Sequence, residues 1–146
     1  MPDDVVTSDD VVAITQLIAA YGPAVDVGDG DAVAALFTED GWYDVAGRRF
    51  EGRPAIAAMV HGGGHQGLIA EGVAHVMGLP HVVVDGDRAT AVNQTVVYRA
   101  GSVWRVAANR WSLVRTAQGW RVASRTNRLL DGSAEARELL RQERRE

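Results

Sequence analysis

Apolar residues recur at helical spacing in the first part of the chain. Between residues 11 and 21 they repeat every three or four positions, which predicts an amphipathic helix that begins after Thr7 or Ser8. Gly22-Pro23 should end or kink this helix, because proline has no N–H to donate and its ring crowds the preceding turn.

Shorter elements follow this helix. A second helical segment carries Asp26, and a third, capped by Asp29, covers residues 31–37. The next predicted elements are a hairpin over residues 42–50, a helix over residues 55–60 and a flexible glycine-rich loop over residues 61–67.

The second half of the chain has the pattern of long strands joined by short turns. Four strands are predicted, at residues 73–84, 88–99, 103–115 and 119–128. Helices followed by such a meander predict an α+β domain, in which a strongly curved antiparallel or mixed sheet wraps around the N-terminal helices as a cone with an internal apolar pocket.

Strand alternation indicates which side chains face that pocket. Isolated polar groups among apolar neighbours are typical of a small-molecule site. The residues on the candidate pocket faces of two strands are Asn93, Thr95, Val97 and Arg99, then Ala107, Asn109, Trp111 and Leu113.

Length and composition indicate one globular domain over residues 1–146, with a core at about residues 9–130 and a charged C-terminal tail at 133–146. A net charge of −4 without a basic cluster argues against nucleic acid or an anionic membrane as partner. The acidic N-terminus lacks the layout of a signal peptide, and no apolar run approaches the ~18 residues of a membrane span, so the expected location is the cytoplasm.

Two missing residue types exclude several mechanisms. Without cysteine there is no thiol nucleophile, disulfide or cysteine metal site. Without lysine there is no Schiff base and no P-loop. His61 and His65 have the spacing of a metal pair, but the three glycines between them oppose a helix, and no metal site is expected.

His75, at the start of the first long strand, is the main candidate for chemistry. A carboxylate such as Asp26 beside one imidazole nitrogen would leave the other free to accept a proton. The alternative is an ordinary core histidine. Tyr21 lies five residues before Asp26, a step of ~140° on a straight helix, so the two share a face only if the Gly22-Pro23 break realigns them.

The order and spacing of several short motifs resemble the SnoaL-like and scytalone dehydratase-like branch of the nuclear transport factor 2-like superfamily over about residues 9–130. The motifs are Tyr21-x4-Asp26-x2-Asp29-x-Asp31, Ala35-Leu36-Phe37-Thr38-Glu39-Asp40-Gly41, the short helix after Gly52-Arg53-Pro54, His75, and Asn109 eleven residues before Trp120.

The resemblance implies a homodimeric cone that acts on a hydrophobic small molecule without a cofactor. It implies a catalytic dyad of His75 and Asp26, a site tyrosine at Tyr21 and a substrate contact at Asn109. The sequence departs from the family at Arg99, where some members have a second histidine, and at Val45, where others have a substrate-holding tyrosine or, in steroid isomerases, an aspartate.

The leading functional hypothesis is a cofactor-independent lyase or cyclase acting on a polyketide, steroid or aromatic compound, with proton abstraction by the dyad. The alternatives are a non-catalytic ligand-binding or dimerisation module and a ketosteroid-isomerase-like isomerase. Epoxide hydrolysis ranks last, because no Asp-Arg-Asp arrangement can be placed.

Arg125 either anchors a polar substrate group with Asn127 or, as the favoured interpretation, forms a surface or interface salt bridge. The predicted substrate contacts are Asn109, Asn93, Val45, Arg99, Trp111 and Asn127.

Overall fold

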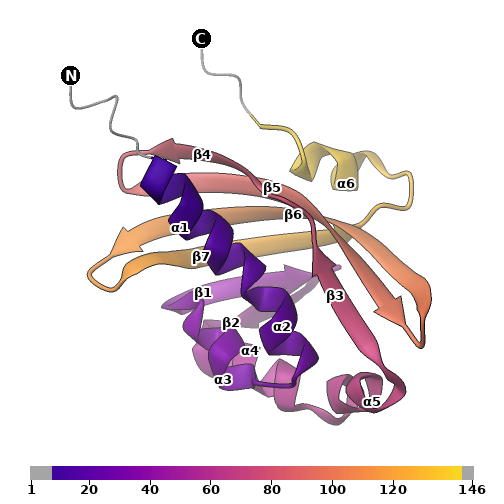
Figure 1. Cartoon of the computed structure of the whole chain (residues 1–146). Coiled ribbons are helices and arrows are strands. Elements are labelled where there is room, and N and C mark those ends of the chain that lie inside the picture. Colours follow the sequence, from indigo (N-terminus) through magenta and orange to yellow (C-terminus); the bar gives the residue numbers. More distant parts are fainter. Residues whose placement is uncertain (1–7, 143–146) are drawn as a thin grey trace.

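The computed structural model describes residues 8–142, which form six helices and one seven-stranded sheet (Figure 1). The helices are α1 (Ser8–Ala19), α2 (Tyr21–Asp26), α3 (Gly30–Ala35), α4 (Gly52–His61), α5 (Gly63–Glu71) and α6 (Ala134–Leu139). The strands are β1 (Phe37–Val45), β2 (Arg48–Glu51), β3 (Val73–Met77), β4 (His81–Asp85), β5 (Arg88–Arg99), β6 (Ser102–Thr116) and β7 (Gly119–Leu129). None of the helices in this part of the chain combines the length and apolar character needed to cross a bilayer.

The sheet is mixed and does not close. Its order is β2-β1-β7-β6-β5-β3, and β4 also pairs with β5. β1 runs parallel to β7, whereas the other neighbours are antiparallel. Figure 1 shows the long strands β5, β6 and β7 curving behind α1. The predicted α+β class and the curved sheet around N-terminal helices are confirmed.

The main core lies between the N-terminal helices and the concave face of the sheet. Ile14 and Ile18 of α1 are fully buried and belong to the same core cluster as Trp111 and Leu113 of β6. On the opposite face of β6, Arg110 donates from Nε to the carbonyl oxygen of Leu139, which places α6 on the outer side of the sheet. The inward face of β6 therefore forms the floor of the space where a site can lie.

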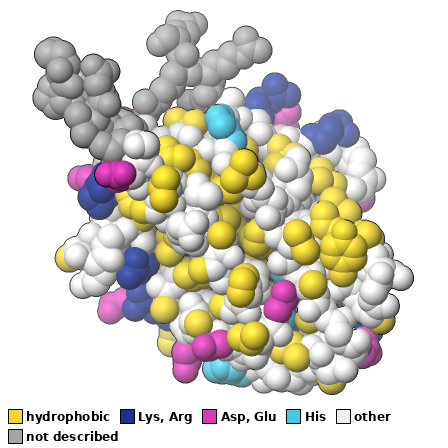
Figure 2. Space-filling view, viewed as in Figure 1, with side chains coloured by type: hydrophobic (Ala, Val, Ile, Leu, Met, Phe, Trp, Pro, Cys, Tyr) yellow, Lys and Arg dark blue, Asp and Glu magenta, His cyan; other side chains and the backbone are white. Residues whose placement is uncertain are grey.

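On the face shown in Figure 2, arginine and acidic side chains are interspersed with apolar ones.

The predicted break after the first helix is confirmed, since α1 ends at Ala19 and α2 begins at Tyr21. Pro23 lies in the first turn of α2, where a missing N–H costs no helix hydrogen bond. Asp29 caps α3, as predicted, by accepting from the backbone N–H of Ala32 at 2.9 Å. The candidate cap Thr7 lies outside the described residues.

The hairpin and the helix near residues 42–60 are also confirmed, with longer bounds. β1 and β2 are joined by Ala46-Gly47, which have φ values of 52° and 93°. Positive φ at both central residues is the requirement of a type I′ turn. The predicted third helix, residues 31–37, ends earlier because Phe37 already starts β1.

The prediction of one strand over residues 73–84 is wrong in one respect, because β3 and β4 are separated at residues 78–80. Both strands pair with β5: Met77 lies opposite Thr95, and His81 lies opposite Val92. Between these two pairs, three residues (78–80) lie opposite only two residues of β5 (93–94). The extra residue makes a bulge, and Pro80 cannot donate to the ladder there. The strand bends at this point, which adds to the curvature of the sheet.

The flexible loop predicted at residues 61–67 is also wrong, because Gly63–Glu71 forms α5. This helix has no capping side chain and buries no residue completely. Tertiary hydrogen bonds hold it instead: Gln66 donates from Nε2 to the carbonyl oxygen of Val60 at 2.9 Å, and His65 contacts that of Val25 at 2.7 Å. Hydrogen bonds to two other helices, α4 and α2, thus override the low helix propensity of glycine.

Gly22 determines how closely α2 approaches β3. A Cβ atom at this position would lie 2.5 Å from the backbone oxygen of His75. Gly22→Ala should therefore force the two elements apart and lower the free energy of unfolding by about 1–3 kcal/mol in urea denaturation. Gly67→Ala in α5, where a Cβ meets open space, is the matched control and should stabilise by up to ~1 kcal/mol. Equal stability of the two variants would contradict this account.

Candidate active site

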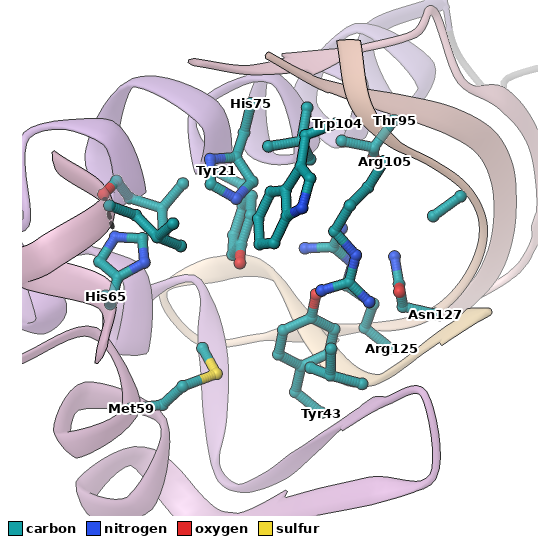
Figure 3. Close-up of a pocket in the computed structure, with 15 residues that line it drawn as sticks. Tyr21, Tyr43, Met59, His65, His75, Thr95, Trp104, Arg105, Arg125 and Asn127 are labelled. Atoms are coloured by element: carbon teal, nitrogen blue, oxygen red, sulfur yellow. Dashed lines mark hydrogen bonds between the residues drawn. The ribbon is translucent and has the colours of Figure 1, made fainter. Parts of the chain in front are cut away.

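A cavity of about 150 Å³ lies between the helices and the concave face of the sheet (Figure 3). It adjoins a wider outer depression of about 510 Å³, with which it shares five lining residues: Val45, Met59, His65, Leu68 and Arg105. The other residues that line the inner cavity are Tyr21, Val25, Tyr43, His75, Thr95, Val97, Trp104, Ala107, Arg125 and Asn127.

Asp26 and His75 meet at the wall of this cavity. Nδ1 of the imidazole lies 2.7 Å from Oδ1 of Asp26, and the backbone N–H of His75 donates to both carboxylate oxygens, at 3.1 and 3.0 Å. Asp26 is the last residue of α2 and His75 the central residue of β3. The carboxylate therefore fixes the backbone and the ring of the histidine together, because Gly22 lets α2 lie directly on this strand.

The pair sets the protonation of His75. A carboxylate can only accept, so the neutral ring carries its proton on Nδ1 and leaves the Nε2 lone pair unprotonated. Burial lowers the pKa of His75, and its interaction with Asp26 opposes this only in part, while Arg125 and His65 lower it further. His75 is therefore neutral near neutral pH, which is the state of a general base.

Tyr21 lies beside His75 in the cavity wall. Its ring contacts that of His75 edge-on, with centroids 6.3 Å apart, and its side chain is buried. Burial raises the pKa of Tyr21 far above its ordinary value, and the neighbouring Tyr43 adds to this. The hydroxyl thus stays protonated and acts as a hydrogen-bond donor rather than an acid.

Arg125 of β7 is a buried cation in the cavity wall, with 1% of its surface exposed. Its guanidinium lies 4.2, 4.5 and 4.3 Å from the ring centroids of Tyr21, Tyr43 and Trp111, respectively. Its Nη1 has no hydrogen-bond partner, and none of the ion pairs among residues 8–142 includes it. A desolvated cation with an unused donor is suited to an oxygen that gains negative charge.

Asn109, predicted to contact substrate, lies behind the cavity wall and holds Arg125 in place. Its Oδ1 accepts from Nε and Nη2 of Arg125, at 3.1 and 2.9 Å, and from Nδ2 of Asn127 at 2.8 Å. Its Nδ2 donates to Oγ1 of Thr95 at 2.7 Å. Both ends of the amide are used within the protein, so Asn109 supports the residues that line the cavity and does not line it itself.

Three other predicted substrate contacts also lie outside the cavity lining. Trp111 is fully buried beneath Arg125 and donates from Nε1 to Oδ1 of Asn93 at 2.9 Å. Asn93 in turn donates to the carbonyl oxygen of Gly78 in the bulge at 2.9 Å. Arg99 lies at the end of β5, where its Nε donates to Oε2 of Glu71 at 2.6 Å. Of the predicted contacts, Val45 and Asn127 do line the cavity.

The favoured interpretation of Arg125 as a salt-bridge residue is wrong, because a bulge in β7 turns it inward. Ser112 pairs with Ser124, but Leu113 pairs with Val122, so Ala123 is an extra residue. Alternation continued from the buried Val122 would have put Arg125 outside. No local turn signal marks this bulge in the sequence.

His61 and His65 lie in different surroundings. Nε2 of His61 accepts from the backbone N–H of Gly30 at 3.2 Å, whereas His65 faces the cavity. Among the described residues, no group of three His, Cys, Asp or Glu side chains is placed to hold a metal ion.

Fold and site together define an α+β cone with a His–Asp pair at the wall of its cavity. A model of the SnoaL-like domain matches residues 6–126. The chain belongs to this family, within the nuclear transport factor 2-like superfamily.

Solved structures give the same result. An NTF2-like protein with a cystatin-like fold from Novosphingobium aromaticivorans is 46% identical, with a TM-score of 0.92 over 97% of this chain and 95% of the other. A protein of unknown function from Mycobacterium tuberculosis is 25% identical, with a TM-score of 0.79 over 95% and 88% of the two chains. A protein named as a candidate aromatic ring hydroxylase from Novosphingobium aromaticivorans is 26% identical, with a TM-score of 0.68 over 84% and 90%. No match to a curated protein was found.

Proposed function

We propose that this protein is a cofactor-independent lyase or cyclase of the dehydratase type, acting on a hydrophobic, oxygenated small molecule. The observation that carries the proposal is the 2.7 Å contact between His75 Nδ1 and Asp26 Oδ1 at the wall of a mainly apolar cavity. This contact leaves Nε2 of His75 as a base, and the side chain is only 16% exposed. Asp26 would stabilise the imidazolium that forms after proton transfer.

Arg125 supports a carbonyl compound as the substrate. A carbonyl oxygen that accepts from its unused Nη1 would gain negative charge when His75 removes the proton from the adjacent carbon. The Tyr21 hydroxyl is a second donor in the same wall. The electron pair of the broken C–H bond then forms an enolate with negative charge on this oxygen. When the carbonyl group re-forms, the electrons expel a leaving group from the carbon β to the carbonyl.

The dimensions of the cavity favour an aromatic or similarly compact substrate. A cavity of about 150 Å³ is the size that accommodates one aromatic ring. The outer depression would then hold the rest of a larger molecule. The name of the neighbour described as a candidate aromatic ring hydroxylase agrees with a ligand of this class.

The isomerase alternative has less support. It would need a carboxylate base at the hairpin position facing the cavity, where Val45 lies. The adjacent Asp44 is paired instead with Nη1 of Arg128 at 2.7 Å and does not line the cavity.

A pH–rate profile of Asp26→Asn tests the dyad. In the wild type, kcat/KM for exchange of the α protons of a ketone should rise with pH as His75 loses its proton, with a midpoint below the ordinary value of about 6.5, because burial lowers its pKa. Asp26→Asn removes the interaction that raises this pKa, so the midpoint should move to still lower pH. The maximal rate should fall about 10²-fold because the ring loses its orientation.

Asp29→Asn is the matched control, since asparagine also caps helices and Asp29 is remote from the cavity lining. It should leave both midpoint and rate unchanged. A midpoint that stays constant or rises in Asp26→Asn would refute the proposed role of the pair.

A further inference from the structure

A second histidine, His65, faces the cavity from α5. Its ring centroid lies 6.0 Å from that of His75, and it lines both the inner cavity and the outer depression. In Figure 3 one of its nitrogens points to a backbone oxygen, while the rest of the ring faces the cavity. His65 therefore lies where the inner cavity meets the outer depression.

The backbone contact assigns the tautomer of His65. Nε2 lies 2.7 Å from the carbonyl oxygen of Val25, and a carbonyl oxygen only accepts, so Nε2 carries a proton. The ring can therefore gain or lose a proton only at Nδ1. The same contact ties α5 to the end of α2, which holds the ring in position.

Loss of a hydroxyl group next to an enolate requires an acid, because hydroxide is a poor leaving group. No Asp or Glu is among the residues that line the cavity. The guanidinium groups of Arg105 and Arg125 do not release protons. The phenols of Tyr21 and Tyr43 belong to a class of weak acids, and burial raises the pKa of Tyr21 further. Imidazole, by contrast, ordinarily titrates close to neutral pH.

We infer that His65 is the general acid that protonates the leaving hydroxyl of a β-hydroxy carbonyl substrate, from its Nδ1. This inference rests on the proposed function and narrows the substrate to a compound with a hydroxyl on the carbon β to a carbonyl. The pair of histidines then divides the two proton transfers, since His75 accepts one proton and His65 donates the other.

The step balances without a co-reactant. His75 Nε2 takes the proton from the α carbon, and the C–H electron pair becomes the new α,β double bond by way of the enolate. The β C–O bond breaks with its electron pair on oxygen, which takes the proton of His65 Nδ1 and leaves as water. His75 ends protonated and His65 neutral, and proton exchange with water restores both.

The neighbouring ring also favours His75 as the base. Burial is the main cause that lowers the pKa of His75, and its electrostatic interaction with His65 lowers it further. Both causes favour the neutral form of the inner ring, which can accept a proton.

Two aromatic ketones separate the two proton transfers. Benzylacetone has no leaving group, so exchange of its α protons in D2O, followed by NMR, reports only the action of His75. The aldol of benzaldehyde and acetone has the same skeleton with a β-hydroxyl, and its dehydration to benzylideneacetone is followed by ultraviolet absorbance.

His65→Gln should lower dehydration of the aldol by about 10²-fold and leave exchange of benzylacetone within about threefold of the wild type. Glutamine keeps an N–H for the carbonyl oxygen of Val25 but cannot titrate. His61→Gln is the matched control, since His61 lies on the neighbouring helix outside the cavity lining and glutamine can still accept from Gly30. It should change neither rate.

The outcomes distinguish the two proposals. Dehydration at the wild-type rate in His65→Gln would overturn the general-acid role alone. A parallel loss of both reactions in His65→Gln would also overturn it, because it would indicate a structural role. A wild-type protein that catalyses neither reaction would overturn the proposed function, and the inference with it.

Discussion

His75→Gln should reduce turnover by about 10²–10⁴-fold, because glutamine cannot accept a proton at the position of Nε2. The backbone N–H of residue 75 still donates to Asp26, so the contact between α2 and β3 is retained. Exchange of the α protons of benzylacetone in D2O measures the effect directly.

His81→Gln provides the control, since His81 is an exposed residue of β4 that does not line the cavity. Its exchange rate and melting temperature should match the wild type. Exchange in His75→Gln within threefold of the wild-type rate would exclude His75 as the base.

Arg125→Met should lower activity far more than stability. Loss of a donor to a developing oxyanion typically costs about 10²–10³ in kcat, so exchange should fall by that factor. The change in stability should be small, because methionine fills similar space among the three aromatic rings, and removal of a buried cation offsets the loss of its two hydrogen bonds to Asn109. Thermal unfolding and the exchange assay together test both effects.

Arg128→Met is the contrasting control. Arg128 lies on the same strand, β7, but pairs with Asp44 and Glu135, at 2.7 and 2.9 Å, outside the cavity. It should lower the melting temperature and leave the exchange rate unchanged. An Arg125→Met variant that loses stability but keeps its activity would show that the buried cation serves the fold rather than the chemistry.

Much of the fold could be predicted because local pattern and tertiary structure agree over most of the chain. The apolar stripe of residues 11–21, the Gly22-Pro23 break and the Asp29 cap each indicate an element that the structure contains. α5 could not be predicted, because hydrogen bonds to Val60 and Val25 hold it, and these partners are visible only in the folded chain.

The candidate site was only partly predictable. The contact of Asp26 with His75 spans 49 positions, and its expectation came from a resemblance rather than from local pattern. Alternation correctly put Asn109 and Trp111 on the inner face, but it cannot distinguish a side chain that lines a cavity from one packed beneath the lining. Arg125 required knowledge of the bulge at Ala123, which reverses alternation in β7.

That bulge determines which face of β7 carries the cation. Deletion of Ala123 would remove the unpaired residue and leave Arg125 and Asn127 inward, because alternation from Val122 would then run without interruption. If Ala123 instead joined the ladder opposite Ser112, every later residue would shift by one position, and Thr126 would face inward in place of Arg125 and Asn127. The inward guanidinium thus depends on the pairing register of this strand, which one unpaired residue maintains.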